Sequence, residues 1–278
     1  MTTAPYLQVR DLSVSFPAKH DAFKAIDRVS FDLAQGEILA LVGESGSGKS
    51  LTSLSIMKLL PEAARWTGQI ILNDVDIATK SRRSMEDVRG AKVGMIFQEP
   101  MTSLNPVLTI ARQMTEGLMR HKLLGKKDAA TVAMASLVDV GITDPDRIMS
   151  QYPHQLSGGM RQRIIIAAAI ALQPSILIAD EPTTALDVTV QANVLDLLID
   201  LKSRLGAGIL LVTHDFAVVA ETADRVAVMR NGRIVEMGTV VEVLKSPKDE
   251  YTRELIESHL TVEKALKLRG AARGIITQ

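Results

Sequence analysis

A glycine-rich stretch in the first fifth of the chain has the residue types and the spacing of a phosphate-binding loop. Its sequence, GESGSGKS from Gly43 to Ser50, matches the pattern G-x-x-x-x-G-K-[ST]. Glycines let backbone amides turn toward phosphate oxygens, and the N-terminus of a following helix adds about half a positive charge. We expect Lys49 to reach the β and γ phosphates of a nucleotide, and the Ser50 hydroxyl to bind Mg²⁺. The predicted phosphate-binding residues are Gly43, Glu44, Ser45, Gly46, Ser47, Gly48, Lys49 and Ser50.

The alternative, a chance glycine-rich turn, is weakened by the flanking residues. Residues 37–43 contain a short continuous apolar run, typical of a strand covered on both faces in a parallel sheet, and residues 49–60 have helical character. A strand before the loop and a helix after it are the context that this motif requires. At an average glycine usage of ~7%, a chance match occurs in roughly one chain of this size in a hundred.

Two carboxylates, Asp180 and Glu181, follow a second apolar run at residues 176–179. They are therefore expected at the C-terminal edge of a buried strand, where open α/β sheets bind their ligands. Asp180 is suited to hold Mg²⁺ through a bound water. Glu181 is suited to act as a general base on an attacking water, a role typically worth ~10²- to 10⁴-fold in rate. The structural alternative is that Asp180 only caps the following turn before Pro182.

A third motif, QLSGGMRQR, precedes the apolar helical run IIIAAAIAL. Its two glycines, Gly158 and Gly159, are poor residues with which to begin a helix, since each costs ~1 kcal/mol relative to alanine in a helix interior. They do allow an anion to approach the helix amides closely, and Ser157 adds a hydroxyl donor. The pattern therefore predicts a second anion-binding helix terminus.

These motifs lie on alternating strands and helices, which indicates an α/β fold. Leu12, Val14 and Phe16 alternate as in a half-buried strand, and so do Phe31 and Leu33. A third buried strand is predicted at residues 209–212. Apolar residues at helical spacing predict a helix that ends near Gly206; they are Val194, Leu197, Leu198, Leu201 and Leu205.

Residues 100–160 are predicted to form an inserted helical subdomain. One amphipathic face is expected to contain Val107, Ile110, Ala111, Met114 and Leu118. Asp144 and Pro145 form a good N-cap and first residue for another short helix. Residues 241–278 are expected to form short helices that end in a mildly basic, solvated tail.

Composition excludes several other classes of protein. The 278 residues are 46% hydrophobic, enough for a substantial core, and carry 32 basic and 32 acidic side chains, so no global field attracts nucleic acid. The absence of cysteine excludes disulfides, thiolate zinc sites and thiolate-held iron-sulfur clusters. The N-terminus lacks the pattern of a secretory signal, and no apolar run approaches the ~20 residues of a membrane-spanning helix.

With all three motifs in this order, residues 5–260 resemble the ATP-binding-cassette (ABC) family. The resemblance implies an α/β P-loop NTPase core of the RecA-like type, with an antiparallel β subdomain and an inserted α-helical subdomain. It also implies that ATP and Mg²⁺ are bound. Gln98 matches the family's Q-loop glutamine, which senses Mg²⁺ and the attacking water. Asp187, in Ala185-Leu186-Asp187, matches the D-loop, and His214 matches the switch histidine that contacts the γ-phosphate.

Phe16 corresponds to the aromatic residue that stacks on adenine in such proteins. Stacking requires the face of a ring and not a hydroxyl, so phenylalanine can replace the commoner tyrosine. A role in the hydrophobic core is the alternative, because Phe16 is also the third residue of an alternating strand.

In this family the motif at Ser157, Gly158 and Gly159 faces ATP bound to a second subunit. The resemblance therefore implies that two ATPase subunits, identical or paralogous, enclose two nucleotides head to tail. It also implies transmembrane permease subunits, a separate solute-binding protein, and a peripheral position at the cytoplasmic face of the inner membrane. The predicted domains are an ABC ATPase domain at residues 5–240, with the helical subdomain at about 100–160, and a C-terminal extension at 241–278.

Three segments of the chain are similar in sequence to those of the ATPase subunits of peptide and nickel importers. These segments are QEPMTSLNPVLTI, YPHQLSGGMRQR and ADEPTTALDVTVQA. Many oligopeptide-type subunits continue past a His-Pro-Tyr-Thr stretch into a cysteine-bearing extension, whereas this chain has Asp249-Glu250-Tyr251-Thr252 and no cysteine. Its five histidines lack metal-ligand spacing, so the sequence does not decide between a peptide and nickel as the transported solute. The main alternative is a soluble ABC ATPase that acts on nucleic acid or ribosomes. In the preferred interpretation, an importer subunit, no nucleic-acid partner is expected. A generic P-loop kinase would leave QLSGGMRQR and His214 unexplained.

Overall fold

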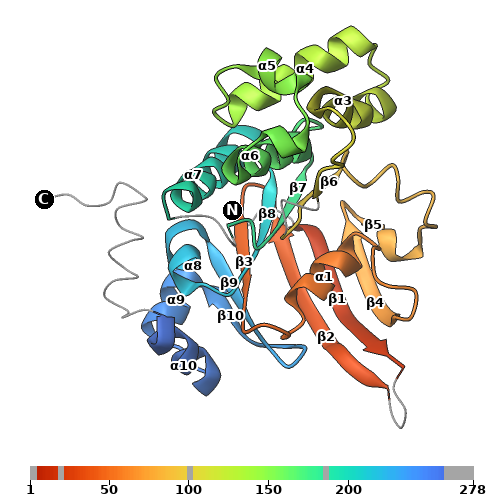
Figure 1. Cartoon of the computed structure of the whole chain (residues 1–278). Coiled ribbons are helices and arrows are strands. Elements are labelled where there is room, and N and C mark those ends of the chain that lie inside the picture. Colours follow the sequence, from red (N-terminus) through yellow and green to blue (C-terminus); the bar gives the residue numbers. More distant parts are fainter. Residues whose placement is uncertain (1–4, 18–21, 99–102, 184–187, 260–278) are drawn as a thin grey trace, which may run out of the picture. The chain divides into compact units, whose positions relative to one another are not determined.

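The structure is a computed structural model that describes residues 5–17, 22–98, 103–183 and 188–259 (Figure 1). The chain forms two compact units. The first unit is built from residues 1–85 and 206–278, and the second from residues 86–205. The phosphate loop belongs to the first unit, and the carboxylates Asp180 and Glu181 belong to the second.

The first unit contains an antiparallel sheet with the strand order β2-β1-β4-β5. Its strands are β1 (Pro5–Phe16), β2 (Phe23–Ala34), β4 (Arg65–Leu72) and β5 (Val75–Asp76), and a 3-10 turn, η1 (Ile77–Thr79), follows. Alternating residues of β1 are fully buried, including Leu12 and Val14. This alternation, seen also at Phe31 and Leu33 of β2, confirms the strands predicted from the period of two.

A second group of strands in the first unit has the order β10-β9-β3-β8. Strand β3 (Ile38–Val42) is parallel to both β8 (Gly208–Thr213) and β9 (Arg225–Arg230), whereas β10 (Arg233–Thr239) is antiparallel to β9. Every residue of β3 and β8 is buried, which explains their continuous apolar sequences. The helices of this unit are α1 (Lys49–Ile56), α8 (Phe216–Thr222), α9 (Val240–Lys245) and α10 (Glu250–His259).

The second unit pairs β6 (Val93–Ile96) with β7 (Ile176–Asp180) in parallel. Helix α6 (Gly158–Ile170) begins at the predicted anion-binding motif, and α7 (Val188–Leu205) ends just before Gly206, as predicted. The remaining elements are α3 (Ile110–His121), α4 (Lys126–Asp139), α5 (Pro145–Ser150) and the 3-10 turn η2 (Pro153–Gln155).

The helical character of residues 103–160 agrees with the sequence, apart from one residue. Val107 was expected on the apolar face of the first helix, but it precedes α3 and is 76% exposed. The helix begins later because Thr109 is its N-cap and accepts a hydrogen bond from the backbone N–H of Arg112. The cap at Asp144, with Pro145 as the first residue of α5, is as predicted.

The C-terminal segment has two short helices in its described part. A capping box between Thr239 and Glu242 begins α9, and α10 extends to His259. The predicted basic tail at residues 260–278 lies outside the described residues. None of the helices in the described ranges is long and apolar enough to cross a membrane. The predicted division of the chain at residue 240 stays a prediction.

Candidate functional site

The predicted phosphate loop connects β3 to α1, and close packing explains two of its glycines. A Cβ at Gly43 would lie 2.1 Å from the backbone oxygen of Met229 in β9. Gly48 has a φ of 108°, and a Cβ there would lie 2.7 Å from Cε of Met229 and 3.0 Å from the backbone oxygen of Ala25. Both positions therefore require glycine, because β9 and β2 pack directly against the loop.

The side chain of Lys49 folds back over this loop. Its ammonium is buried, with 4% of the residue exposed, and donates to the backbone oxygens of Gly43 at 2.7 Å and Glu44 at 2.8 Å. The N-terminus of α1 lies next to it, and its N-cap residue, Gly48, makes no side-chain cap hydrogen bond to the amides of the first turn. A positive charge and helix amides thus converge on one short loop.

The buried hydroxyl of Ser47 tests whether the loop is suited to a phosphate. Among the described residues this Oγ has no hydrogen-bond partner. Buried polar groups are normally paired, so an orphaned hydroxyl in the same loop as a buried ammonium indicates a site for a polar ligand. The loop therefore fits an anion with several acceptor oxygens.

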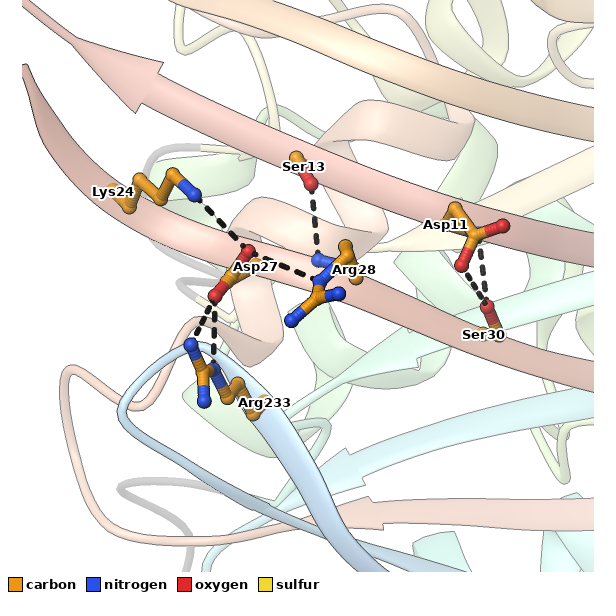
Figure 2. A network of polar contacts seen from close by, with 7 residues as sticks. All are labelled: Asp11, Ser13, Lys24, Asp27, Arg28, Ser30 and Arg233. Carbon is orange, nitrogen blue, oxygen red and sulfur yellow. Dashed lines mark hydrogen bonds and ion pairs between the residues drawn. The ribbon is translucent and has the colours of Figure 1, made fainter.

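The turn between β9 and β10 supports the loop from a second side. The backbone N–H of Gly232 donates to the oxygen of Ser47 at 2.9 Å, and its backbone oxygen accepts from the N–H of Asp27 at 2.8 Å. Figure 2 shows Arg233 reaching Asp27, with its Nε 2.9 Å from Oδ2, while Lys24 binds the same carboxylate. The hydrogen bond from Arg233 is the main cause, with Lys24 contributing, of the lowered pKa of Asp27. This ion-paired network ties β2 to the hairpin that holds the loop.

Phe16 lies at the end of β1 and is half-buried. It pairs across the strands with Phe23, the first residue of β2, whose side chain is 65% exposed. The structure therefore places a second aromatic residue opposite Phe16 on the neighbouring strand. Phe23 was not among the predicted site residues, although an aromatic side chain among polar residues at the start of a strand is a signal that could have identified it.

The predicted catalytic residues of the second unit meet where β6 and β7 end. Asp180, the last residue of β7, is 4% exposed. Glu181 follows with a φ of 47°, and its Oε2 accepts a hydrogen bond from Nε2 of Gln98 at 2.9 Å. Because the two strands are parallel neighbours, their carboxyl ends emerge at the same edge. A carboxylate and a side-chain amide are thus hydrogen-bonded to each other at this edge.

The second predicted anion-binding motif begins α6. Ser157 is the N-cap, and its Oγ accepts from the backbone N–H of Met160 at 3.3 Å. Within the described residues, a Cβ at Gly158 would meet no atom within 4 Å outside its chain neighbours and its own helix, whereas one at Gly159 would lie 3.3 Å from Val190. In the same helix, the buried Gln162 donates through Nε2 to the backbone oxygen of Pro182 at 2.7 Å. The loop that contains Glu181 is therefore tied to this helix by a residue that sequence analysis did not single out.

The two remaining predicted site residues, His214 and Asp187, lie in other parts of the chain. His214 is exposed and follows β8 directly, and Asp215 caps the next helix, α8. Asp187, with the rest of the predicted D-loop, lies outside the described residues. The structure thus groups the phosphate loop, Phe16 and His214 in the first unit, and the carboxylates, Gln98 and the α6 motif in the second. Their functional roles stay predictions.

The fold and these motifs define an ATP-binding cassette, and comparison with known proteins supports that class. The family model described as "ABC transporter" matches residues 26–184. The chain is 52% identical over 256 residues to the peptidoglycan transport ATP-binding protein YejF of Agrobacterium fabrum, covering 91% of this chain and 47% of that protein. It thus spans about half the length of this relative.

A second relative is covered more completely. The chain is 49% identical over 259 residues to the oligopeptide transport ATP-binding protein OppD of Bacillus subtilis, covering 92% of this chain and 72% of the relative. A solved dimeric structure of MJ0796, a bacterial ABC transporter cassette, is 26% identical with a TM-score of 0.75, and covers 84% of this chain and 98% of that one. The chain therefore belongs to the ABC transporter family. The predicted family, fold class and ATPase class are confirmed, and a soluble ATPase acting on nucleic acid or ribosomes is not favoured.

Proposed function

We propose that this chain is the ATP-hydrolysing subunit of an ABC importer that drives the uptake of peptides through a membrane permease. The observation that carries the proposal is the buried Lys49 ammonium, which is bound to two carbonyl oxygens of a loop that also contains the orphaned Ser47 hydroxyl. This loop has a charged donor, a free hydroxyl and helix amides, which suit the phosphates of ATP.

The proposal assigns residues of the chain to each part of ATP. The amides of residues 43–50 and the Lys49 ammonium bind the phosphates, and Phe16 stacks on the adenine ring. Mg²⁺ would be held by the Ser50 hydroxyl, by Gln98 and, through water, by Asp180. When bound, the ion neutralises charge on the phosphate oxygens. Hydroxyl, amide and carboxylate oxygens are the donors that Mg²⁺ prefers.

Hydrolysis requires a base and a group that aligns water with the γ-phosphate. Glu181 is the proposed base, and the hydrogen bond from Gln98 orients its carboxylate. His214 contacts the γ-phosphate from the end of β8. The bond between Gln162 and Pro182 fixes the loop that follows β7, so that the carboxylate keeps its position.

The active form is a pair of cassettes. In it, Ser157, Gly158, Gly159 and Asp187 of one chain contact the ATP bound by the other. The open space at Gly158 supports this role, since a phosphate can approach the helix amides there. The solved relative named as a dimeric ABC transporter cassette supports the pairing. Binding of ATP closes the pair and hydrolysis reopens it, which drives the permease.

The proposed cargo is a peptide or a peptide-containing cell-wall fragment, supplied by a separate solute-binding protein. The relatives are named for peptidoglycan and oligopeptide transport, which favours this class over nickel. The chain is proposed to be peripheral, at the cytoplasmic face of the inner membrane. Its proposed domains are the ATPase domain at residues 5–240, with a helical subdomain at about 100–160, and the extension at 241–278.

Two substitutions in the full chain test the ATPase. Lys49→Ala removes the buried ammonium, so micromolar binding of ATP should be lost in a direct titration. Glu181→Gln keeps the shape of the side chain but removes the base, so ATP should bind while phosphate release falls at least ~10²-fold. The matched control, Glu62→Gln, changes an exposed acid outside the site and should leave both measurements unchanged. Normal turnover by Glu181→Gln would eliminate Glu181 as the base.

A further inference from the structure

Tyr251 in α10 contacts the phosphate loop, although it lies far from that loop in the sequence. Its hydroxyl oxygen accepts a hydrogen bond from the backbone N–H of Glu44 at 3.1 Å, across a separation of 207 residues. Helix α10 lies beyond residues 26–184, which the family model matches, and within the proposed C-terminal extension. The extension thus reaches the first residues of the loop.

The position of Tyr251 is fixed by its surroundings. The residue is only 3% exposed, and the Arg230 guanidinium lies over its ring at 4.5 Å from the centroid. Its backbone N–H donates to Oδ1 of Asp249 at 2.9 Å, and the carboxylate of Glu236 accepts from the backbone N–H groups of Lys248 at 2.9 Å and Asp249 at 3.1 Å. Burial raises the pKa of the Tyr251 phenol, so the hydroxyl stays neutral. The hydroxyl oxygen of Tyr251 is therefore held in position to accept the hydrogen bond from the backbone N–H of Glu44.

The bond to Glu44 acts on the same peptide group that Lys49 binds. The N–H of Glu44 and the carbonyl of Gly43 belong to one planar amide, with the two groups on opposite sides. Tyr251 binds the N–H, and the Lys49 ammonium binds the carbonyl at 2.7 Å. Rotation of this peptide plane would break both interactions. The tyrosine hydroxyl therefore controls where the carbonyl that holds the ammonium points.

We propose that Tyr251 is a positioning residue for the nucleotide. From α10 it fixes the peptide plane between Gly43 and Glu44, and through that plane it places the Lys49 ammonium for the phosphates. The inference rests on the proposed ATP-binding function and adds the C-terminal extension to that site. Since coupling is reciprocal, nucleotide bound at the loop also stabilises the docking of α10.

Removal of the hydroxyl alone gives a measurable prediction. In Tyr251→Phe the ring stays beneath Arg230, but the N–H of Glu44 loses its acceptor and the peptide plane can rotate. Loss of this hydrogen bond lowers the population of the loop conformation in which the Gly43–Glu44 peptide plane holds the Lys49 ammonium. The apparent Kd for MgATP rises in inverse proportion to the population of this binding-competent conformation. We expect the Kd to rise about three- to tenfold.

The experiment is an equilibrium titration of the full 278-residue chain with MgATP, together with a thermal melt. Tyr6→Phe, which removes a hydroxyl from β1 of the same unit, is the matched control and should bind MgATP as the wild type does. For Tyr251→Phe we expect the raised Kd with full binding stoichiometry. An unchanged Kd, or a lowered melting temperature and stoichiometry without a change in Kd, would assign Tyr251 a purely structural role and overturn the inference.

Hydrogen exchange locates the effect. In Tyr251→Phe the amide of Glu44 should exchange faster than in the wild type, while MgATP should slow exchange in α10 of the wild type. Exchange of the Glu44 amide at the wild-type rate would contradict the inference. If the wild-type chain itself failed to bind MgATP, the proposed function would fail first, and that result is distinct from equal binding by both chains.

Discussion

Gly232, at the turn between β9 and β10, bonds to both the phosphate loop and β2. Its backbone N–H donates to the backbone oxygen of Ser47 at 2.9 Å. Its backbone oxygen accepts from the N–H of Asp27 at 2.8 Å. The residue has a φ of 77°, and a Cβ would lie 2.6 Å from the backbone oxygen of Ala25. Substitution Gly232→Ala should therefore strain the turn and push it away from the loop.

The magnitude follows from these contacts. A left-handed conformation costs ~1–2 kcal/mol for a residue with a Cβ, and the two backbone hydrogen bonds contribute about 0.5–1.5 kcal/mol each. The expected loss in the free energy of unfolding is therefore ~2–5 kcal/mol, because the backbone of Ala25 cannot rotate away as a side chain can. Gly36→Ala is the matched control, since Gly36 has a φ of 66° and a Cβ there would meet no described atom within 4 Å beyond its chain neighbours. It should lose only ~1–2 kcal/mol.

Urea unfolding followed by tryptophan fluorescence measures the difference. The single tryptophan, Trp66, lies in β4 of the same unit and reports on its unfolding. A parallel titration with MgATP should show severalfold weaker binding for Gly232→Ala and unchanged binding for Gly36→Ala. Equal losses of stability in the two variants, with equal affinities for ATP, would refute the argument that the turn supports the loop.

Three further substitutions test other parts of the account. Phe16→Ala should weaken ATP binding about tenfold, in line with base stacking worth ~1–3 kcal/mol, and Phe23→Ala should weaken it less than twofold. A larger loss of affinity in Phe23→Ala than in Phe16→Ala would identify Phe23 as the ring that stacks on adenine. Gly158→Asp should leave ATP binding by the isolated chain intact and abolish cooperative turnover by the pair, because a carboxylate repels phosphate; a preserved Hill coefficient would count against this. Gln162→Leu should lower the free energy of unfolding by ~1–3 kcal/mol in calorimetry, because the carbonyl of Pro182 is left unpaired; an unchanged value would mean that this bond contributes little.

The sequence predicted the parts of the fold that depend on local patterns. Strands β3, β7 and β8 are buried on both faces and therefore have continuous apolar sequences. The phosphate loop was predictable for a similar reason, since its glycines and Lys49 lie within eight consecutive residues. The cap at Asp144 was visible because its partner is three residues away.

The parts that the sequence could not predict depend on contacts between distant segments or on competing local signals. Tyr251 and Glu44 are 207 residues apart, and no periodicity relates them. In the sequence, Gly232 resembles any hairpin glycine. Only the structure shows that a Cβ at this position would lie 2.6 Å from the backbone oxygen of Ala25. Val107 fitted the helical pattern, but the cap at Thr109 began the helix later.

A head-to-tail pair of chains around ATP is the central claim, and crosslinking tests it most directly. The chain has no cysteine, and Ser45 and Ser157 are both exposed, so Ser45→Cys and Ser157→Cys give two single-thiol chains. They are mixed in the Glu181→Gln background and treated with a short thiol crosslinker. The account predicts a covalent dimer that forms only when MgATP is present. It would be contradicted if the mixture stayed monomeric with ATP bound, or if a chain carrying both cysteines crosslinked within itself.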